Sequence, residues 1–420
     1  MKHGVRTRAV ALTRQLGPGL ITGAADDDPS GIATYSQAGA QAGYGLLWTM
    51  VLTYPLMCAI QLVSAYIGRV TGVGLAANMG KIFPRYVVTV LVALLFVANT
   101  INIGADLAVM GAVANSLIGI NVHVLTIVLA LVSLTLQLFI PYRRYATLLK
   151  WMTLVLLSYF VVLVFVHIDA RALVTGLVVP RIDNKAMITT IVALFGTTIS
   201  PYLFFWQTAQ EVEEVNNDPK AEPLIAQPWQ ARREFRRIWF DTLSGMGFST
   251  VVAMAIIIAT AATLHARGIV DIQSAQQAAQ ALEPVAGKFA FLLFSLGIIG
   301  TGMLAIPVLA GSAAYGIGDS RGWHSGLDLK VRQAPAFYSV IAAATLLGII
   351  MDWSRLDPIK ALYWSAVING VVAVPMMLAM MIVVNKHSRM GKFTAPRVMT
   401  ILGWAGTAVM AAAAIAMFIF

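Results

Sequence analysis

The sequence has few charged residues and a single cysteine. Asp, Glu, Lys and Arg make up 11% of its 420 residues, and hydrophobic residues make up 59%. Ordinary globular domains are roughly 25% charged. A soluble fold of this length has no way to bury so much apolar surface, so the composition predicts a protein that crosses a membrane several times. With Cys58 alone, an intrachain disulfide and a cysteine-based metal cluster are both excluded.

Signals for export and for catalysis are also missing. The N-terminus, MKHGVRTR, is basic, but no cleavable signal follows, because the segment DDDP at 26–29 interrupts the next apolar run. No nucleophile–base constellation, phosphate loop or run of metal ligands occurs, so we expect neither an enzyme nor a resident cofactor. The net charge of +10 is located between the apolar runs, where it orients a membrane protein, and no nucleic-acid surface is expected.

Apolar runs of about 20 residues, the length of a membrane-spanning helix, occur along the whole chain. The shortest is 335–351, and the longest polar connection, about 215–237, is predicted to be only a loop. The eleven predicted spans are 14–39, 45–68, 87–115, 122–140, 147–168, 188–214, 238–264, 288–316, 335–351, 358–384 and 398–419.

The distribution of lysine and arginine orients these spans. If the N-terminus is cytoplasmic, the N-terminal arm and the connections on its side carry most of the 29 Lys and Arg residues. Cytoplasmic loops are enriched in these residues, so we expect a cytoplasmic N-terminus and, after eleven spans, an external C-terminus. The expected setting is the lipid bilayer of a bacterial inner membrane, with the protein acting as a monomer.

Two of the spans contain residues that interrupt a helix. The first span contains GAADDDPSG (23–31), where Pro29 disfavours a helical conformation at Asp28 and donates no backbone hydrogen bond. The sixth span contains FGTTISPYLFFW, where Pro201 follows Ser200. In lipid, a broken helix is tolerated only where protein buries it or where it lines a cavity. A single break is read equally well as a simple kink, but breaks in corresponding positions of two halves indicate a transporter site at the midplane.

The paired breaks predict the architecture. We expect an all-α polytopic membrane protein with one transporter domain over residues 1–420. It would contain two inverted five-helix repeats, about 14–168 and 188–384, followed by an eleventh helix at about 398–419. The two halves share no visible sequence identity, so the repeat rests on the paired breaks alone.

The carboxylates of the first break make a cation the expected ligand. A charge at the centre of a span costs roughly 2.5–3.5 kcal/mol, so retaining one implies a bound cation, a water-filled cavity or protonation. Carboxylate and carbonyl oxygens suit Mg²⁺, Ca²⁺ or Mn²⁺. The second break adds Thr197, Thr198, Ser200 and Tyr202, but no Met, His or Cys.

Other polar residues within the spans have two interpretations. Asn99, Asn102 and Asp106 are three and four residues apart, so they share one helix face. They form either a polar patch that joins helices or a polar wall of the permeation path. Asn369 allows the same two interpretations.

The end of the sixth span supports an alternative substrate class. Phe204, Phe205 and Trp206 offer aromatic faces to an ammonium group, so an importer of an organic cation or amino acid is a second hypothesis. Glu211 and Glu214 are predicted to be solvated charges at the helix end rather than the lining of an inner vestibule. A sensor is a third reading, disfavoured because no soluble signalling domain is visible in the sequence.

The segment LGPGLITGAADDDPSGIATYSQAGAQAGYGLLW (16–48) resembles the first-span signature of the NRAMP divalent-metal transporters. The flanks 17–19 (GPG) and 37–40 (QAGA) carry much of this resemblance, which continues at lower density through ten core spans. It implies a LeuT-type fold of eleven or twelve helices, a cytoplasmic N-terminus and proton-coupled uptake of Mn²⁺ or Fe²⁺.

The resemblance also implies metal-binding positions in the first span. The family's Asp-Pro-Gly-Asn falls on 28–31, so Asp28 matches the metal-binding aspartate, and Gly31 replaces the metal-binding asparagine. A backbone carbonyl ligand of the family falls on Ala25.

The sixth and third spans depart further from the family pattern. The family's Met-Pro-His falls on 200–202, so Ser200 replaces the thioether that favours transition metals, and the second carbonyl ligand falls on Thr197. The family's proton-relay Asp and Glu fall on Asp106 and Val109, so only the Asp is retained.

These departures are similar to those of the NRAMP-related magnesium transporters, in which a wider site accepts a hydrated ion. Mg²⁺ gives up its waters reluctantly, and the added carboxylates of Asp26 and Asp27 would hold such an ion through its water shell. The leading hypothesis is a secondary transporter of Mg²⁺ and/or Mn²⁺ that works by alternating access without proton coupling. The residues predicted to contact the ion or its waters are Asp28, Asp27, Asp26, Ala25, Thr197, Ser200, Gly31 and Asp106.

Overall fold

Long apolar helices make up most of the structure. The computed structural model describes residues 23, 26–140, 153–351 and 357–419. Within these ranges, eight helical segments are long and apolar enough to cross a membrane, and the two shorter apolar helices are Leu154–Phe165 and Pro335–Met351. The prediction of an all-helical membrane protein is therefore confirmed.

The described helices coincide with the predicted spans. Residues 14–22 and 24–25 of the first span and 147–152 of the fifth lie outside the described residues. The main helices are α3 (Pro29–Ala42), α4 (Leu47–Thr71), α6 (Arg85–Ile118), α7 (Val122–Phe139), α9 (Ser158–Phe165), α11 (Lys185–Thr198), α12 (Pro201–Asn217), α13 (Ala231–Thr263), α16 (Ala290–Arg321), α17 (Pro335–Met351), α18 (Pro358–Val384) and α20 (Arg397–Ile419).

Short helices fill several of the connections. They are α5 (Leu75–Met79), α10 (Ala170–Val178), α14 (Ala275–Ala279), α15 (Glu283–Ala286) and α19 (His387–Met390). Between α12 and α13 the predicted loop 215–237 is too long, because α12 continues to Asn217 and α13 already begins at Ala231. The reason is that this charged start of α13 is amphipathic: Glu234 is buried, whereas Arg232 and Arg233 are exposed.

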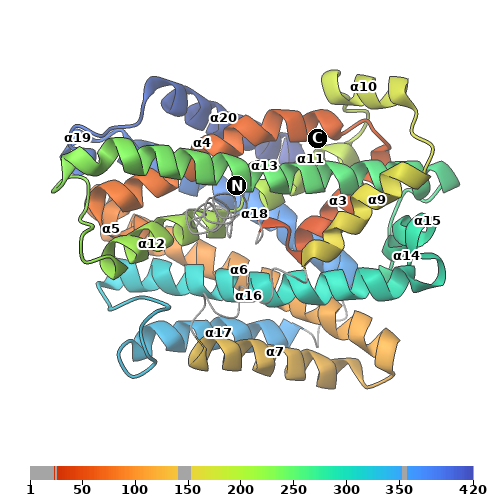
Figure 1. Cartoon of the computed structure of the whole chain (residues 1–420), viewed down its shortest axis with the longest axis horizontal. Helices are drawn as coiled ribbons and strands as arrows, with labels where there is room; N and C mark the ends of the chain where they lie inside the picture. Colours follow the sequence, from red (N-terminus) through yellow and green to blue (C-terminus); the bar gives the residue numbers. More distant parts are fainter. Residues whose placement is uncertain (1–22, 24–25, 141–152, 352–356, 420) are drawn as a thin grey trace, which may run out of the picture.

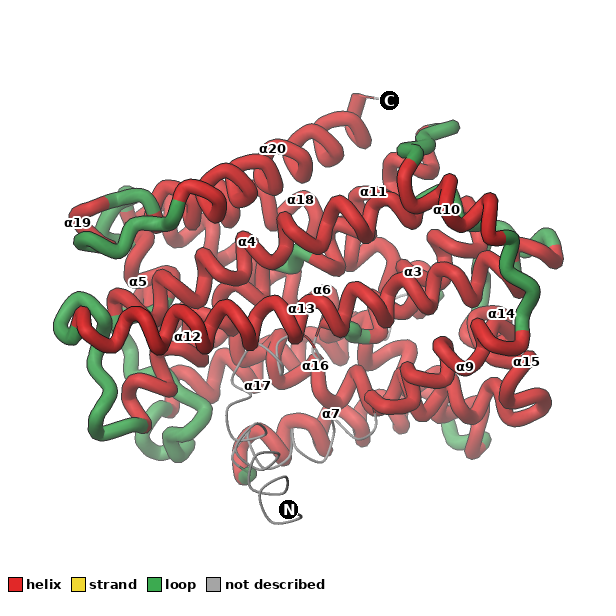
Figure 2. The backbone as a smooth tube through the Cα atoms, turned by 45° about the horizontal axis from the view of Figure 1, so that its top comes forward, coloured by secondary structure: helices red, strands yellow, loops and turns green. Residues whose placement is uncertain are grey.

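The helices run in similar directions along the molecule (Figure 1). In this view and in the tilted view of Figure 2, α20 lies at one edge, α7 and α17 lie at the opposite edge, and α3, α6, α13 and α16 lie between them. In the middle, α3 packs against α13, α12 against α4, α11 against α18, and α6 against both α16 and α18. Both broken segments are thus enclosed by other helices.

Candidate cation site at the two broken helices

The first break lies where the proline predicted it. Asp26 still has helical geometry, Asp27 and Asp28 do not, and α3 begins at Pro29. Asp28 caps α3, because its Oδ1 accepts hydrogen bonds from the Gly31 amide at 2.7 Å and from the Ser30 hydroxyl at 2.7 Å. Aspartate at the N-cap and proline at the first helical position both favour a helix start, so the local sequence fixes this carboxylate at the break.

The second oxygen of Asp28 reaches a neighbouring helix. Its Oδ2 accepts from the Asn102 side-chain amide on α6 at 2.9 Å, and the Asn102 Oδ1 accepts from the Ser365 hydroxyl on α18 at 2.6 Å. All three side chains are buried. Asp28 is therefore held by α3 and α6, and α18 orients its partner.

Asp26 and Asp27 point to a different helix. The Ser249 hydroxyl on α13 lies 2.6 Å from the Asp26 Oδ2 and 3.1 Å from the Asp27 Oδ1. A hydroxyl has one hydrogen, so it donates to one of these carboxylates at a time. The other carboxylate oxygen of each residue, Asp26 Oδ1 and Asp27 Oδ2, is buried and has no hydrogen-bond partner among the described residues.

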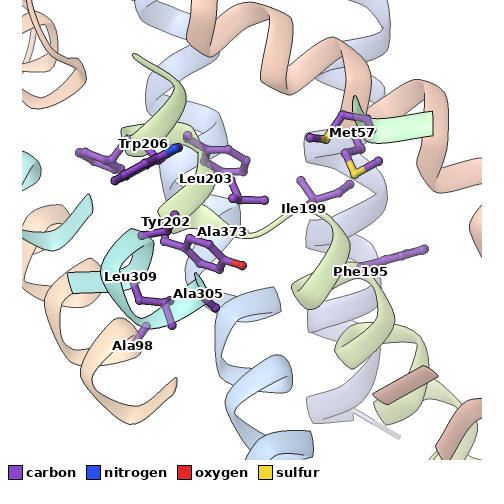
Figure 3. Packing of buried hydrophobic residues seen from close by; sticks show 14 of the residues in the cluster. Met57, Ala98, Phe195, Ile199, Tyr202, Leu203, Trp206, Ala305, Leu309 and Ala373 are labelled. Carbon is purple, nitrogen blue, oxygen red and sulfur yellow. The ribbon is translucent and has the colours of Figure 1, made fainter. Parts of the chain in front are cut away.

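The second break also lies where the sequence predicted it. Helix α11 ends at Thr198 and α12 begins at Pro201, and Figure 3 shows Ile199 in the non-helical link between them. The Ser200 hydroxyl lies 2.7 Å from the carbonyl oxygen of Gly196 and 2.9 Å from that of Thr197, and its single hydrogen is shared between these two acceptors. This hydroxyl therefore satisfies backbone groups of its own segment, which a broken helix in a membrane requires.

The two breaks meet at Gly31. A Cβ atom built on Gly31 would lie 3.1 Å from the Thr197 Oγ1, 3.3 Å from the Tyr35 ring and 3.4 Å from the Asp26 carbonyl oxygen. These distances bring a hydroxyl of the second break beside the backbone of the first. They also mean that a side chain at position 31 requires Thr197 or Tyr35 to move.

The polar face of α6 divides between two roles. Asn102 belongs to the site, whereas the Asn99 amide bonds the Leu309 carbonyl at 2.8 Å and the Ser312 hydroxyl at 3.0 Å on α16. Asp106 is fully buried, and neither of its carboxylate oxygens has a hydrogen-bond partner among the described residues. It is close enough to Asp28 for their charges to interact.

The carboxylates do not converge on one point. Among the described residues, no group of three or more His, Cys, Asp or Glu side chains is arranged to hold a metal ion alone. Nor does any described Lys, Arg or His form an ion pair with Asp26, Asp27 or Asp28. Buried carboxylates without a counter-charge are costly, so these groups require a cation, water or protonation. A cation bound here would need amides, hydroxyls, carbonyls or water as further ligands. Of the predicted contact residues, Ala25 lies outside the described part of the chain.

Sequence reasoning named Asn102 as a possible wall of the permeation path but did not predict that Asn102 and Ser249 orient the carboxylates. Asn102 had a usable signal, its spacing from Asp106 on one helix face, but its pairing with Asp28 depends on how α3 meets α6. Ser249 is one hydroxyl in a long apolar run, and nothing local marks it.

The prediction that Glu211 is a solvated charge is wrong. Glu211 is fully buried, and its carboxylate lies 2.5 Å from Arg237 on α13, which also pairs with Glu214 at 3.0 Å and Glu234 at 3.2 Å. Arg69 on α4 extends this network to Glu234 at 3.4 Å. The error follows from the early start of α13, which carries Arg237 against α12.

The aromatic residues that follow the second break pack against α16. A Cβ on Gly311 would lie 3.0 Å from the Trp206 ring, and one on Gly316 would lie 3.4 Å from the Phe205 ring. Trp206 also meets Tyr315 edge to face, with 6.3 Å between ring centroids. Phe204, Phe205 and Trp206 are all fully buried, so none of these rings presents an exposed face to an organic cation in this structure.

Over nearly its whole length the chain is similar to known proteins. The family model described as "Natural resistance-associated macrophage protein-like" (Nramp) matches residues 19–420. The divalent metal cation transporter MntH of Klebsiella pneumoniae (strain 342) is 27% identical over 399 residues, covering 93% of this chain and 90% of the relative.

Two solved structures show the same fold. A manganese transporter of Eremococcus coleocola superposes with a TM-score of 0.69 at 17% identity, covering 96% of this chain and 85% of the other. A Na⁺-coupled sialic acid symporter superposes with a TM-score of 0.58 at 11% identity, covering 96% and 89%. The fold is therefore that of the LeuT-type transporters. Because the family model matches nearly the whole chain, this protein belongs to the Nramp family of membrane transporters and is not an enzyme.

Proposed function

We propose that this protein transports divalent metal cations, Mg²⁺ and/or Mn²⁺, by alternating access, with the ion bound between the two broken helices. The observation that carries the proposal is the first break, where three adjacent buried carboxylates have no basic ion-pair partner among the described residues. The relatives named as divalent metal cation and manganese transporters support the same substrate class.

Asp28 would supply the main charge, because its two oxygens are already oriented by α3 and by Asn102. Asp26 and Asp27 turn toward α13 and would act on the ion through its water shell. The carbonyls of Ala25 and Thr197 and the hydroxyl of Ser200 would complete an oxygen-only set. Such a set suits hard cations, and Mg²⁺ in particular usually keeps several waters.

Position 31 supports a relaxed selectivity. The family's amide ligand is absent there, and the Thr197 hydroxyl occupies the neighbouring space. A hydroxyl binds a transition metal less strongly than the amide and the thioether that the family pattern has at positions 31 and 200. We therefore infer that the site accepts Mg²⁺ as well as Mn²⁺.

Transport would not be coupled to protons. The carboxylate of Asp106 is retained on α6, but the family's neighbouring glutamate is replaced by Val109, which is fully buried. A proton relay through this helix would lack its second carrier.

The packing supports two inverted repeats, about 14–168 and 188–384. If the repeats correspond helix by helix, α3 corresponds to α12 and α13 corresponds to α4. The contact of α3 with α13 then has its counterpart in the contact of α12 with α4, and both contacts are present. The protein would act as a monomer, with a cytoplasmic N-terminus and an external C-terminus.

The test is a flux assay in proteoliposomes that contain a trapped Mg²⁺ or Mn²⁺ indicator together with a pH dye. We expect both ions to enter without acidification of the lumen. Acidification during Mn²⁺ entry would contradict the uncoupled mechanism and leave the substrate class intact. If neither ion enters, divalent metal transport is wrong, and labelled amines and amino acids become the substrates to test.

A further inference from the structure

The outer surface of α13 carries a groove whose lining residues do not belong to either break. It has a volume of about 460 Å³ and is lined by Tyr54 from α4 and by Arg236, Trp239, Phe240, Leu243 and Ser244 from α13. We propose that this groove binds an anionic phospholipid, whose phosphate contacts Arg236 and Arg232 and whose acyl chain follows α13.

The apolar part of the groove continues along the helix. The Tyr54 hydroxyl donates to the Leu243 carbonyl at 3.2 Å, which holds α4 against α13. Beyond this contact, Phe240, Phe248 and Val251 are 63%, 43% and 51% exposed. Their spacing of eight and three residues keeps them on one face of the helix, so the exposed apolar track fits an extended hydrocarbon chain.

Arg236 lines the charged end of the groove, and Arg232 lies one turn before it on α13. Arg232, Arg233 and Arg236 are exposed, and only Arg233 pairs with a described carboxylate, that of Glu234 at 3.4 Å. Arg237, on the inward side, is already bound to three glutamates. Arg232 and Arg236 form no ion pair with any residue that the structure describes. They are free to bind a phosphate, whose geometry matches the guanidinium fork.

The position of these arginines favours a lipid over a soluble anion. They precede the apolar stretch of α13 directly, and two exposed tryptophans flank them, Trp229 at 74% and Trp239 at 46% exposure. Tryptophan is enriched at the membrane–water boundary, and basic pockets beside membrane helices bind anionic headgroups. A headgroup site is thus continuous with an acyl-chain site.

The test compares lipid retention by purified protein that is reconstituted with equal amounts of phosphatidylglycerol and phosphatidylcholine and then measured by native mass spectrometry. The variant is R232Q/R236Q. The matched control is R85Q, because Arg85 is also exposed at the start of a long apolar helix and is followed by an exposed aromatic residue, Tyr86. We expect wild type and R85Q to retain phosphatidylglycerol preferentially, and R232Q/R236Q to retain it at least about tenfold less, the loss expected for charge-assisted contacts.

Two further variants keep the test decisive. R232K/R236K should retain part of the preference, because it keeps the charges and loses only the fork geometry. W239A should weaken retention of both lipids and preserve the preference. Equal retention of phosphatidylglycerol by R232Q/R236Q and wild type, or equal retention of both lipids by wild type, would overturn the proposal.

Discussion

The two broken helices direct their polar groups differently. At the first break, Asp28 reaches to α6, and Asp26 and Asp27 reach to α13. At the second break, the Ser200 hydroxyl turns back to the carbonyls of its own segment. Although the breaks hold corresponding positions in the proposed repeats, only the first presents charge to its neighbours. The first break is therefore expected to determine binding, whereas the second supplies backbone geometry and a hydroxyl.

The largest effect is expected at the centre of the first break. Asp28→Ala should reduce Mn²⁺ uptake into proteoliposomes more than about 100-fold, beyond the usual loss for a residue that only orients a ligand. The matched control is Asp169→Ala, because Asp169 caps α10 through the amides of Arg171 and Ala172, at 2.9 and 3.0 Å, and is exposed. Both changes remove a helix cap, so wild-type uptake by folded Asp28→Ala would show that the assigned site is wrong.

A smaller effect is expected at the group that orients Asp28. Asn102→Ala should raise the KM for Mn²⁺ about 10- to 100-fold, the range for partners that hold a ligand in place. Asn99→Ala removes a similar amide from the same helix face, but its partners are on α16. We expect Asn99→Ala to lower the melting temperature with little change in KM. Equal KM values for the two variants would show that Asn102 does not contribute to the site.

Ser249 tests whether Asp26 and Asp27 take part in binding. Ser249→Ala removes their shared donor and should weaken ion affinity roughly tenfold, the lower end of the range for a supporting residue. Ser249→Thr keeps the hydroxyl and should restore most of the affinity. If Ser249→Ala binds Mg²⁺ and Mn²⁺ like wild type in calorimetric titrations, the site consists of Asp28 without its neighbours.

The smallest effect is expected at the second break. Ser200→Ala should change uptake less than about fivefold, because the hydroxyl is a neutral ligand that already donates within its own segment. The loss of one neutral interaction typically costs only about 1 kcal/mol, or about fivefold in affinity. Initial rates measured beside Asn102→Ala provide the comparison. A loss at Ser200 as large as that at Asn102 would mean that both breaks supply ligands equally.

Local signals in the sequence predicted the fold well. Apolar length located the spans, and Pro29 and Pro201 located both breaks, because each proline acts on its own helix. Interactions between segments that are far apart in the sequence were harder to predict from local signals. The Ser249 and Glu211 contacts depend on where α13 approaches α3 and α12, and the charged start of α13 resembles a loop until its inward partners are known. The carboxylates were therefore predicted as one cluster, whereas the structure divides them between two helices.

The close approach of Gly31 and Thr197 has a consequence for how this protein changes over evolutionary time. Any side chain introduced at position 31 meets Thr197 at 3.1 Å, so substitutions at the two positions are not independent. Asparagine at position 31, which the family pattern contains, would require the Thr197 hydroxyl to give way by a few tenths of an ångström. A conversion between the two kinds of site therefore depends on how far Thr197 can move, which couples positions 31 and 197 in evolution.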